Sequence, residues 1–177
     1  MKPNNGVAPR YQQLLKCFTH LPQQMLSFDG VENVTEFVLH SLCDEGCLNL
    51  ARAAYFIDNP DFDCLKGVAG FNKDESLYSC KTALNDQEKF KEHVNTCAFN
   101  KKVRDITAAS ARRSDQDINR TVEILANKLG FNNPLHHSWI IKHDNYGLLI
   151  FETESGDKEQ CEEFVKGLSL LGFCPVS

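Results

Sequence analysis

Two apolar segments in the first half of the chain decide the fold: Leu50-Ala-Arg-Ala-Ala-Tyr-Phe-Ile57 and Leu65-Lys-Gly-Val-Ala-Gly-Phe71. Between them lies Asp58-Asn-Pro-Asp-Phe-Asp63, which is rich in residues that form turns. Short apolar runs that flank such a turn are typical of β-hairpins. The sequence therefore predicts a hairpin over residues 50–71.

The same arrangement recurs near the end of the chain. Trp139-Ile-Ile141 and Gly147-Leu-Leu-Ile-Phe151 flank the polar segment Lys142-His-Asp-Asn-Tyr146. This pattern predicts a second hairpin. We expect one antiparallel sheet to hold both hairpins.

Four segments have the apolar spacing of amphipathic helices, with one face directed inward. Their boundaries follow from capping and helix-ending residues. The predicted helices are Val7 to Leu21, ended by Pro22; a helix capped by Asp29 that stops near Gly46; Ser114 to Leu129, ended by Gly130; and Asp157 to Leu171.

The middle of the chain, from Asn72 to Ser114, has few apolar residues and predicts short helices and loops. Asp86 to Cys97 has the spacing of one helix, and Val103 to Ala109 is expected to be a short strand or an extended segment. Strand pairs and helices in this order predict an α+β fold with a central antiparallel sheet and flanking helices.

Composition excludes several classes of function. The chain has 177 residues, a size typical of one domain, and a formal net charge of -5, which disfavours nucleic acid as a partner. No secretory signal or membrane-spanning run is recognisable, so we expect a cytoplasmic protein without a membrane partner, whose eight cysteines remain thiols.

Three groups of residues have the chemistry of a metal or catalytic site. His40, Cys43 and Cys47 have helical spacing for zinc, but no fourth ligand is nearby, so no metal site is predicted. Cys80 or Cys97 beside His93 would form a nucleophilic pair only after folding. Glycine-rich phosphate loops are absent from the sequence. We therefore predict no catalytic residue and no cofactor.

Three segments resemble the GAF domain, a family of sensory modules related to PAS domains. Ala51 to Asp58 is similar to the first core strand of the family, Leu65 to Phe71 to its second, and Ser138 to Phe151 to its closing hairpin. The likeness spans residues 31–171. The length predicts a single domain over residues 1–177, and the resemblance implies that residues 1–30 are an N-terminal helical extension of it and residues 31–171 a GAF-like core.

The resemblance also implies a profilin-like architecture, with helices on one face of the sheet and a ligand pocket on the other, covered by the middle segment. Ligand pockets combine an apolar lining with a few polar groups. On that basis we expect an apolar lining and two polar anchors; the lining residues are Phe56, Phe71, Tyr78 and Trp139, and the anchors are Arg112 and His137.

These observations predict a noncatalytic sensory or regulatory module. It would bind a small ligand or a partner protein, signal through its terminal helices, and form a homodimer through them. Two alternatives stay open. One is an adaptor that has no pocket and uses its acidic surface for binding, and the other is a cysteine-based redox enzyme of GAF-like fold.

Overall fold

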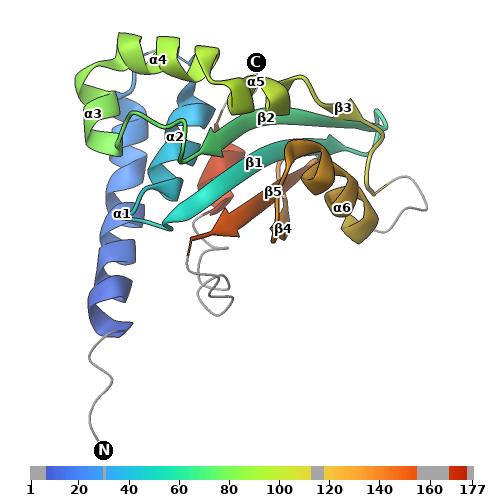
Figure 1. The fold of residues 1–177 in the computed structure, drawn as a ribbon, viewed down its shortest axis with the longest axis horizontal. Coiled ribbons are helices and arrows are strands. Elements are labelled where there is room, and N and C mark those ends of the chain that lie inside the picture. Colours follow the sequence, from blue (N-terminus) through green and yellow to red (C-terminus); the bar gives the residue numbers. More distant parts are fainter. Residues whose placement is uncertain (1–6, 30, 113–117, 155–167, 175–177) are drawn as a thin grey trace, which may run out of the picture.

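A computed structural model describes residues 7–29, 31–112, 118–154 and 168–174. The protein is α+β, and its five-stranded antiparallel sheet has the order β3-β2-β1-β5-β4 (Figure 1). β1 pairs with both β2 and β5, which confirms that one sheet holds both predicted hairpins. The strands are β1 Leu50–Asn59, β2 Cys64–Asn72, β3 Thr107–Ala108, β4 Leu135–Ile140 and β5 Tyr146–Thr153.

The strands form because their apolar residues alternate between two buried faces. In β1, Ala53 and Tyr55 belong to one apolar cluster, whereas Ala54 and Phe56 belong to the other. Side chains in a strand point alternately to opposite faces of the sheet. β1 and β5 are therefore buried on both sides, which explains why both read as nearly continuous apolar runs.

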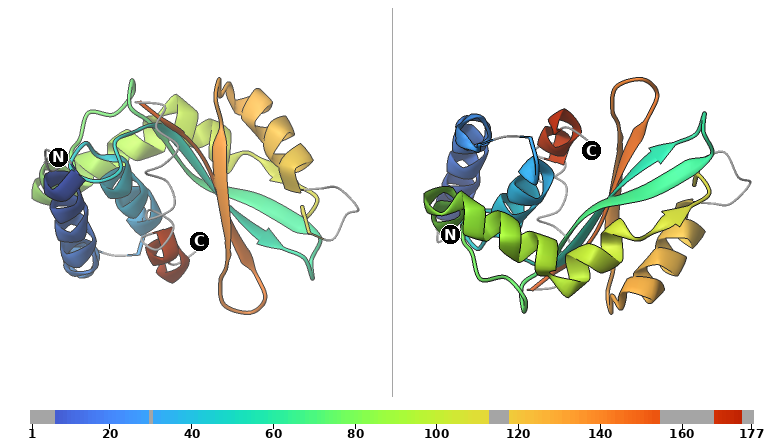
Figure 2. Two further views of the ribbon diagram at one scale, coloured as in Figure 1. Left: turned by 90° about the horizontal axis from the view of Figure 1, so that it is seen from below. Right: turned by 90° about the horizontal axis from the view of Figure 1, so that it is seen from above.

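Helices cover both faces of the sheet (Figure 2). α1, α2 and the short 3₁₀ helix η1 lie on one side, and α5 and α6 lie on the other. The expected arrangement had helices on one face only; the sequence of the middle segment hides α5 because so few of its residues are apolar. The bounds are α1 Val7–Ser27, α2 Val34–Cys43, α3 Cys80–Asn85, α4 Gln87–Thr96, α5 Ala98–Arg104, α6 Ile118–Leu129 and η1 Ser169–Phe173.

The first helix is longer than predicted. Pro22 lies inside α1, which continues to Ser27, so the expectation that Pro22 ends the helix is wrong. An interior proline removes one helical hydrogen bond and costs about 3 kcal/mol. Leu21, just before the proline, is fully buried, and Phe28, just after the helix, is buried in the same core, so burial on both sides of Pro22 offsets this cost.

Two other helix boundaries also differ. α2 begins at Val34 after Asn33, whose backbone is left-handed with φ 62°, and Asp29 does not cap it. Val103 and Arg104 form the end of α5 instead of the start of an extended segment. Only Thr107 and Ala108 of that segment form a strand. The helix predicted over residues 86–97 is confirmed as α4, and Asp86 accepts a capping hydrogen bond from Lys89 N.

Some predicted features lie outside the described residues. These are the cap at Ser114 and most of the helix from Asp157 to Leu171, of which the final residues form η1. Among the helices that the structure describes, none combines the length and the apolar character needed to span a bilayer.

Two of the eight cysteines do not remain thiols. Cys17 of α1 and Cys47, which follows α2, form a disulfide with their Cα atoms 5.7 Å apart. Their pairing corrects the expectation of free thiols and removes Cys47 from the zinc set considered with His40 and Cys43. No local spacing pattern in the sequence predicts this disulfide, because Cys17 and Cys47 are separated by 30 positions.

Candidate functional site

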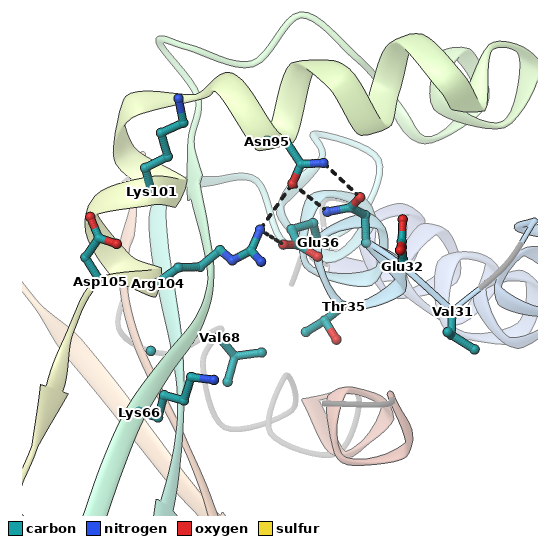
Figure 3. A pocket seen from close by; sticks show the side chains of 12 residues that line it. Val31, Glu32, Thr35, Glu36, Lys66, Val68, Asn95, Lys101, Arg104 and Asp105 are labelled. Atoms are coloured by element: carbon teal, nitrogen blue, oxygen red, sulfur yellow. Dashed lines mark hydrogen bonds and ion pairs between the residues drawn. The ribbon is translucent and has the colours of Figure 1, made fainter. Parts of the chain in front are cut away.

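A polar hollow of about 550 Å³ lies where the start of α2, the edge of β2 and the junction of α4 with α5 meet (Figure 3). We call it the α2 hollow. Its size falls within the range of small-molecule sites. It is lined by Val31, Glu32, Asn33, Thr35, Glu36, Lys66, Gly67, Val68, Asn95, Lys101, Arg104 and Asp105.

Two asparagines join the helices at the top of the hollow. The side-chain amides of Asn33 and Asn95 exchange two hydrogen bonds, of 3.1 and 3.2 Å. Asparagine adopts left-handed backbone more readily than most residues, and Asn33 uses that conformation just before α2 begins. The turn thereby fixes the start of α2 against the end of α4.

Arg104 extends from α5 across the same region (Figure 3). Its Nη1 donates a hydrogen bond of 3.1 Å to Asn95 Oδ1 and lies 3.5 Å from Glu36 Oε1. Glu36 is only 5% exposed, and a buried carboxylate is costly unless it has a charged partner. Arg104 therefore stabilises Glu36 and is itself held in one orientation.

Lys66 reaches the hollow from β2, and its amine points toward the centre (Figure 3). Among the described residues, the Lys66 amine has neither a hydrogen bond nor an ion pair. Lys101, by contrast, points away from the hollow. Lys66 is thus a cation available to a ligand.

A glycine brings the two cations together. A Cβ atom on Gly67 would lie 1.9 Å from the carbonyl oxygen of Val103, so α5 can rest on β2 only because this residue has no side chain. Gly70 is similarly close to α5. Because α5 packs so closely on β2, Arg104 of α5 and Lys66 of β2 line the same hollow.

The arrangement is suited to an anionic group. Lys66 and Arg104 converge, and guanidinium and ammonium groups bind carboxylates and phosphates through charge-assisted hydrogen bonds. The lining around residues 31–36 also presents the start of α2, where the helix dipole is positive. Of the three acidic residues in the lining, Glu36 is already paired with Arg104.

Two of the six predicted ligand residues line a different hollow. Phe71 and Tyr78 border a space of about 300 Å³ together with His40. His40 packs edge-on against Phe71, with ring centroids 4.9 Å apart. Phe56 is fully buried in the cluster under α5 and α6.

The other three predicted residues lie around β4. Arg112 sits over the ring of Tyr146 at 3.8 Å and donates a 2.9 Å hydrogen bond to Ser138 Oγ. His137 stacks on Trp139, which in turn stacks on Tyr55 (centroids 5.8 and 5.7 Å). The structure therefore does not bring the six residues together around one ligand.

Sequence reasoning missed both cations of the α2 hollow. Lys66 is a single charge inside an apolar strand, which is the one signal that could have marked it. Arg104 belongs to a short basic cluster that reads as a solvated helix face. Neither pattern indicates that the two side chains meet.

A cysteine and a histidine do form a pair. Cys97 Sγ lies 3.3 Å from His93 Nε2. Burial, with a smaller contribution from Glu75, raises the pKa of the Cys97 thiol, and burial lowers the pKa of His93. Both groups are therefore neutral near pH 7, whereas a nucleophilic cysteine requires a thiolate. Within the described ranges, no three His, Cys, Asp or Glu residues gather as a metal site would require.

By its fold and its hollow, the protein belongs to the α+β class. It has an antiparallel sheet covered by helices and a charged hollow at its surface. Comparison with family models, with curated proteins and with solved structures finds no match for this chain. Function therefore has to be argued from the site itself.

Proposed function

We propose that this protein is a noncatalytic regulatory module that binds a small anionic metabolite in the α2 hollow. One observation carries the proposal: the Lys66 amine points into the same hollow as the Arg104 guanidinium and has no partner among the described residues. A cation in such a position gains a partner when an anion binds.

Ligand binding in this place would couple three elements. Lys66 belongs to β2, Arg104 to α5, and Glu36 to the first turn of α2. An anion that contacts Lys66 and Arg104 stabilises the arrangement in which these elements are close, and so shifts the population toward it. A partner protein that recognises this arrangement would then sense the ligand.

A GAF-like, profilin-like architecture is consistent with this proposal. It is supported by the order of the elements, with the first hairpin beside the closing hairpin through the pairing of β1 with β5. The proposed ligand site lies beside the middle segment, which contributes Asn95 and Arg104 to its lining, but at the outer edge of β2.

Isothermal titration calorimetry tests the proposal with four probes: inorganic phosphate, a dicarboxylate, a sugar phosphate and a nucleoside monophosphate. We expect at least one to bind, with an affinity that falls as salt is added. Lys66→Ala should weaken binding roughly tenfold, the equivalent of about 1.4 kcal/mol.

Lys102→Ala is the matched control, since Lys102 is an exposed lysine of α5 that does not line the hollow. It should bind as the unmodified protein does. Equal losses in both variants would reduce the effect to net charge and contradict the proposed site. The absence of binding by every probe would contradict the proposed ligand class.

A further inference from the structure

The smaller hollow, of about 300 Å³, lies between α2 and the segment that follows β2. We call it the His40 hollow. Its buried lining consists of His40, Cys43 and Phe71, and residues 76–79 form its outer wall. It shares no lining residue with the α2 hollow, so a ligand here would occupy a site separate from the proposed anion site.

His40, on the last turn of α2, is a polar side chain without a hydrogen bond. It is 7% exposed, and its Nδ1 is buried and has no partner. Its Nε2 also has no hydrogen bond to a described residue, but this atom remains accessible. A polar group withdrawn from water without a hydrogen bond destabilises the folded state. Because His40 lines the hollow, a ligand there can supply the missing partner to Nε2.

Aromatic rings surround this imidazole. Phe71 contacts it edge-on, with ring centroids 4.9 Å apart. Phe90 packs edge-on against both His40 and Tyr78, at 5.4 and 5.9 Å. Leu77, which is 78% exposed, adds an apolar side chain to the lining. Aromatic rings prefer edge-on or offset contacts with one another, so this lining is suited to a flat aromatic ring.

The charged groups of the lining already have partners. Lys73 Nζ lies 3.5 Å from Glu45 Oε1 and 2.8 Å from Glu154 Oε1. Asp44 Oδ2 accepts a hydrogen bond of 3.3 Å from Cys80 N. An anionic ligand would meet the carboxylates of Asp44 and Glu45, while the lysine that could attract it is engaged. The lining therefore favours a ligand without charge.

The imidazole selects the polar group of that ligand. Burial, with a smaller effect from His93, lowers the pKa of His40 to about 3, so the ring is uncharged near pH 7. A neutral imidazole has one N–H donor and one acceptor nitrogen. A hydroxyl group both donates and accepts, and so it can pair with Nε2 in either tautomer of His40.

We propose that the His40 hollow binds a small neutral aromatic molecule that carries a hydroxyl group, such as a phenol. The hydroxyl forms a hydrogen bond with His40 Nε2, and the ring of the ligand contacts Phe71, Leu77 and Tyr78. The volume of about 300 Å³ is at the lower end of the range for ligand pockets, which limits the ligand to one or two rings.

NMR titration of the full chain with p-cresol, toluene and benzoate tests this proposal. The ring-nitrogen signals of His40 should shift as p-cresol binds, whereas those of His20, an exposed histidine of α1, should not. We expect p-cresol to bind about three- to tenfold more tightly than toluene, which has the same ring but no hydroxyl. Benzoate, which is charged, should bind at His40 more weakly than p-cresol.

Two variants assign the contacts. His40→Phe keeps an aromatic ring without the nitrogens, so p-cresol and toluene should bind to it equally. Leu77→Ser changes an exposed position on which the core does not depend, and it should weaken both ligands severalfold. Leu26→Ser is the matched control, since Leu26 is 88% exposed and does not line the hollow. It should bind both as the unmodified protein does, and so should Lys66→Ala, which affects the anion site alone.

Several outcomes would overturn the proposal. One is that p-cresol leaves the His40 signals unchanged. Another is equal binding of p-cresol and toluene by the unmodified protein, or a preference for p-cresol that persists in His40→Phe, since the hydroxyl would then not contact this ring. Tighter binding of benzoate than of p-cresol at His40 would overturn the neutral class. Loss of p-cresol binding in Lys66→Ala would place the ligand in the α2 hollow.

Discussion

Trp139 is the most informative single residue for the packing of the sheet. It is the only tryptophan of the chain, and it stacks on Tyr55 with an interplanar angle of 6°. Gly147 lies opposite it in the β4–β5 ladder. A Cβ atom on Gly147 would lie 2.5 Å from the indole ring, so the absence of a side chain there lets Trp139 lie flat.

Gly147→Ala should therefore displace the indole ring and lower the free energy of unfolding by roughly 1–3 kcal/mol, the usual cost of overpacking. Tryptophan fluorescence should shift to longer wavelength, because the ring becomes more exposed. Urea unfolding measures the loss of stability. Gly46→Ala is the control, since no atom lies within 4 Å of the added Cβ; an unchanged spectrum in Gly147→Ala would show that the ring does not depend on this glycine.

Residue types alone predicted only part of the candidate site. Phe71 and Tyr78 do border a hollow, as expected of aromatic side chains, which are common in the lining of ligand pockets. Lys66 and Arg104 were not predicted, since their proximity depends on α5 resting on Gly67. Such a contact between distant segments leaves no periodic signal in the sequence.

At the scale of elements, α1 is the helix most dependent on one covalent bond. Its buried residues Leu14 and Leu21 pack toward α2, while Tyr11 and Leu15 remain about half exposed. The disulfide from Cys17 to Cys47 ties its middle to the segment that follows α2. The bond therefore holds α1 against the core where apolar burial is incomplete.

Cys17→Ser should lower the free energy of unfolding by about 3 kcal/mol, because a bond across 30 positions restricts the unfolded chain. Urea unfolding with and without a reductant measures the effect, and reductant should destabilise only the protein that has the bond. Cys64→Ser, at a free and partly exposed thiol, should change little. If reductant left the unmodified protein as stable as before, this role of the disulfide would be rejected.

The elements differ in how well their sequences predicted them. β1, β2 and β5 were predicted because burial on both faces leaves long apolar runs. α5 was not, since it is short and packs through Phe99 and Val103 on glycines of β2. α1 passed its expected end at Pro22, because burial of Leu21 before it and of Phe28 after the helix outweighed local propensity.

At the scale of the whole molecule, the sheet separates two apolar clusters, one packed with α5 and α6 and the other with α1 and α2. The cluster with α1 and α2 surrounds His40, which contacts the rings of Phe71 and Phe90 and is 7% exposed. His40 Nδ1 has no hydrogen-bond partner within the described part of the chain. A titratable group is thus placed inside the core that joins α2 to the sheet.

This histidine should make the protein sensitive to acid. Burial, with a smaller effect from His93, lowers the pKa of His40 from 6.5 to about 3. Below pH 6.5 the unfolded chain binds a proton that the folded protein excludes, so the stability is complete above pH 6.5 and is lost as the pH falls toward 3. The slope approaches about 1.4 kcal/mol per pH unit.

Urea unfolding at about pH 7 and about pH 4.5 measures this loss, to which carboxylates also contribute. His40→Leu should reduce the difference between the two pH values by roughly 2–3 kcal/mol, since leucine has no proton to bind in either state. His20→Gln, at an exposed histidine of α1, should leave the difference unchanged. Equal acid sensitivity in His40→Leu and the unmodified protein would mean that the core admits a charged imidazole, and would place the acid-sensitive group elsewhere.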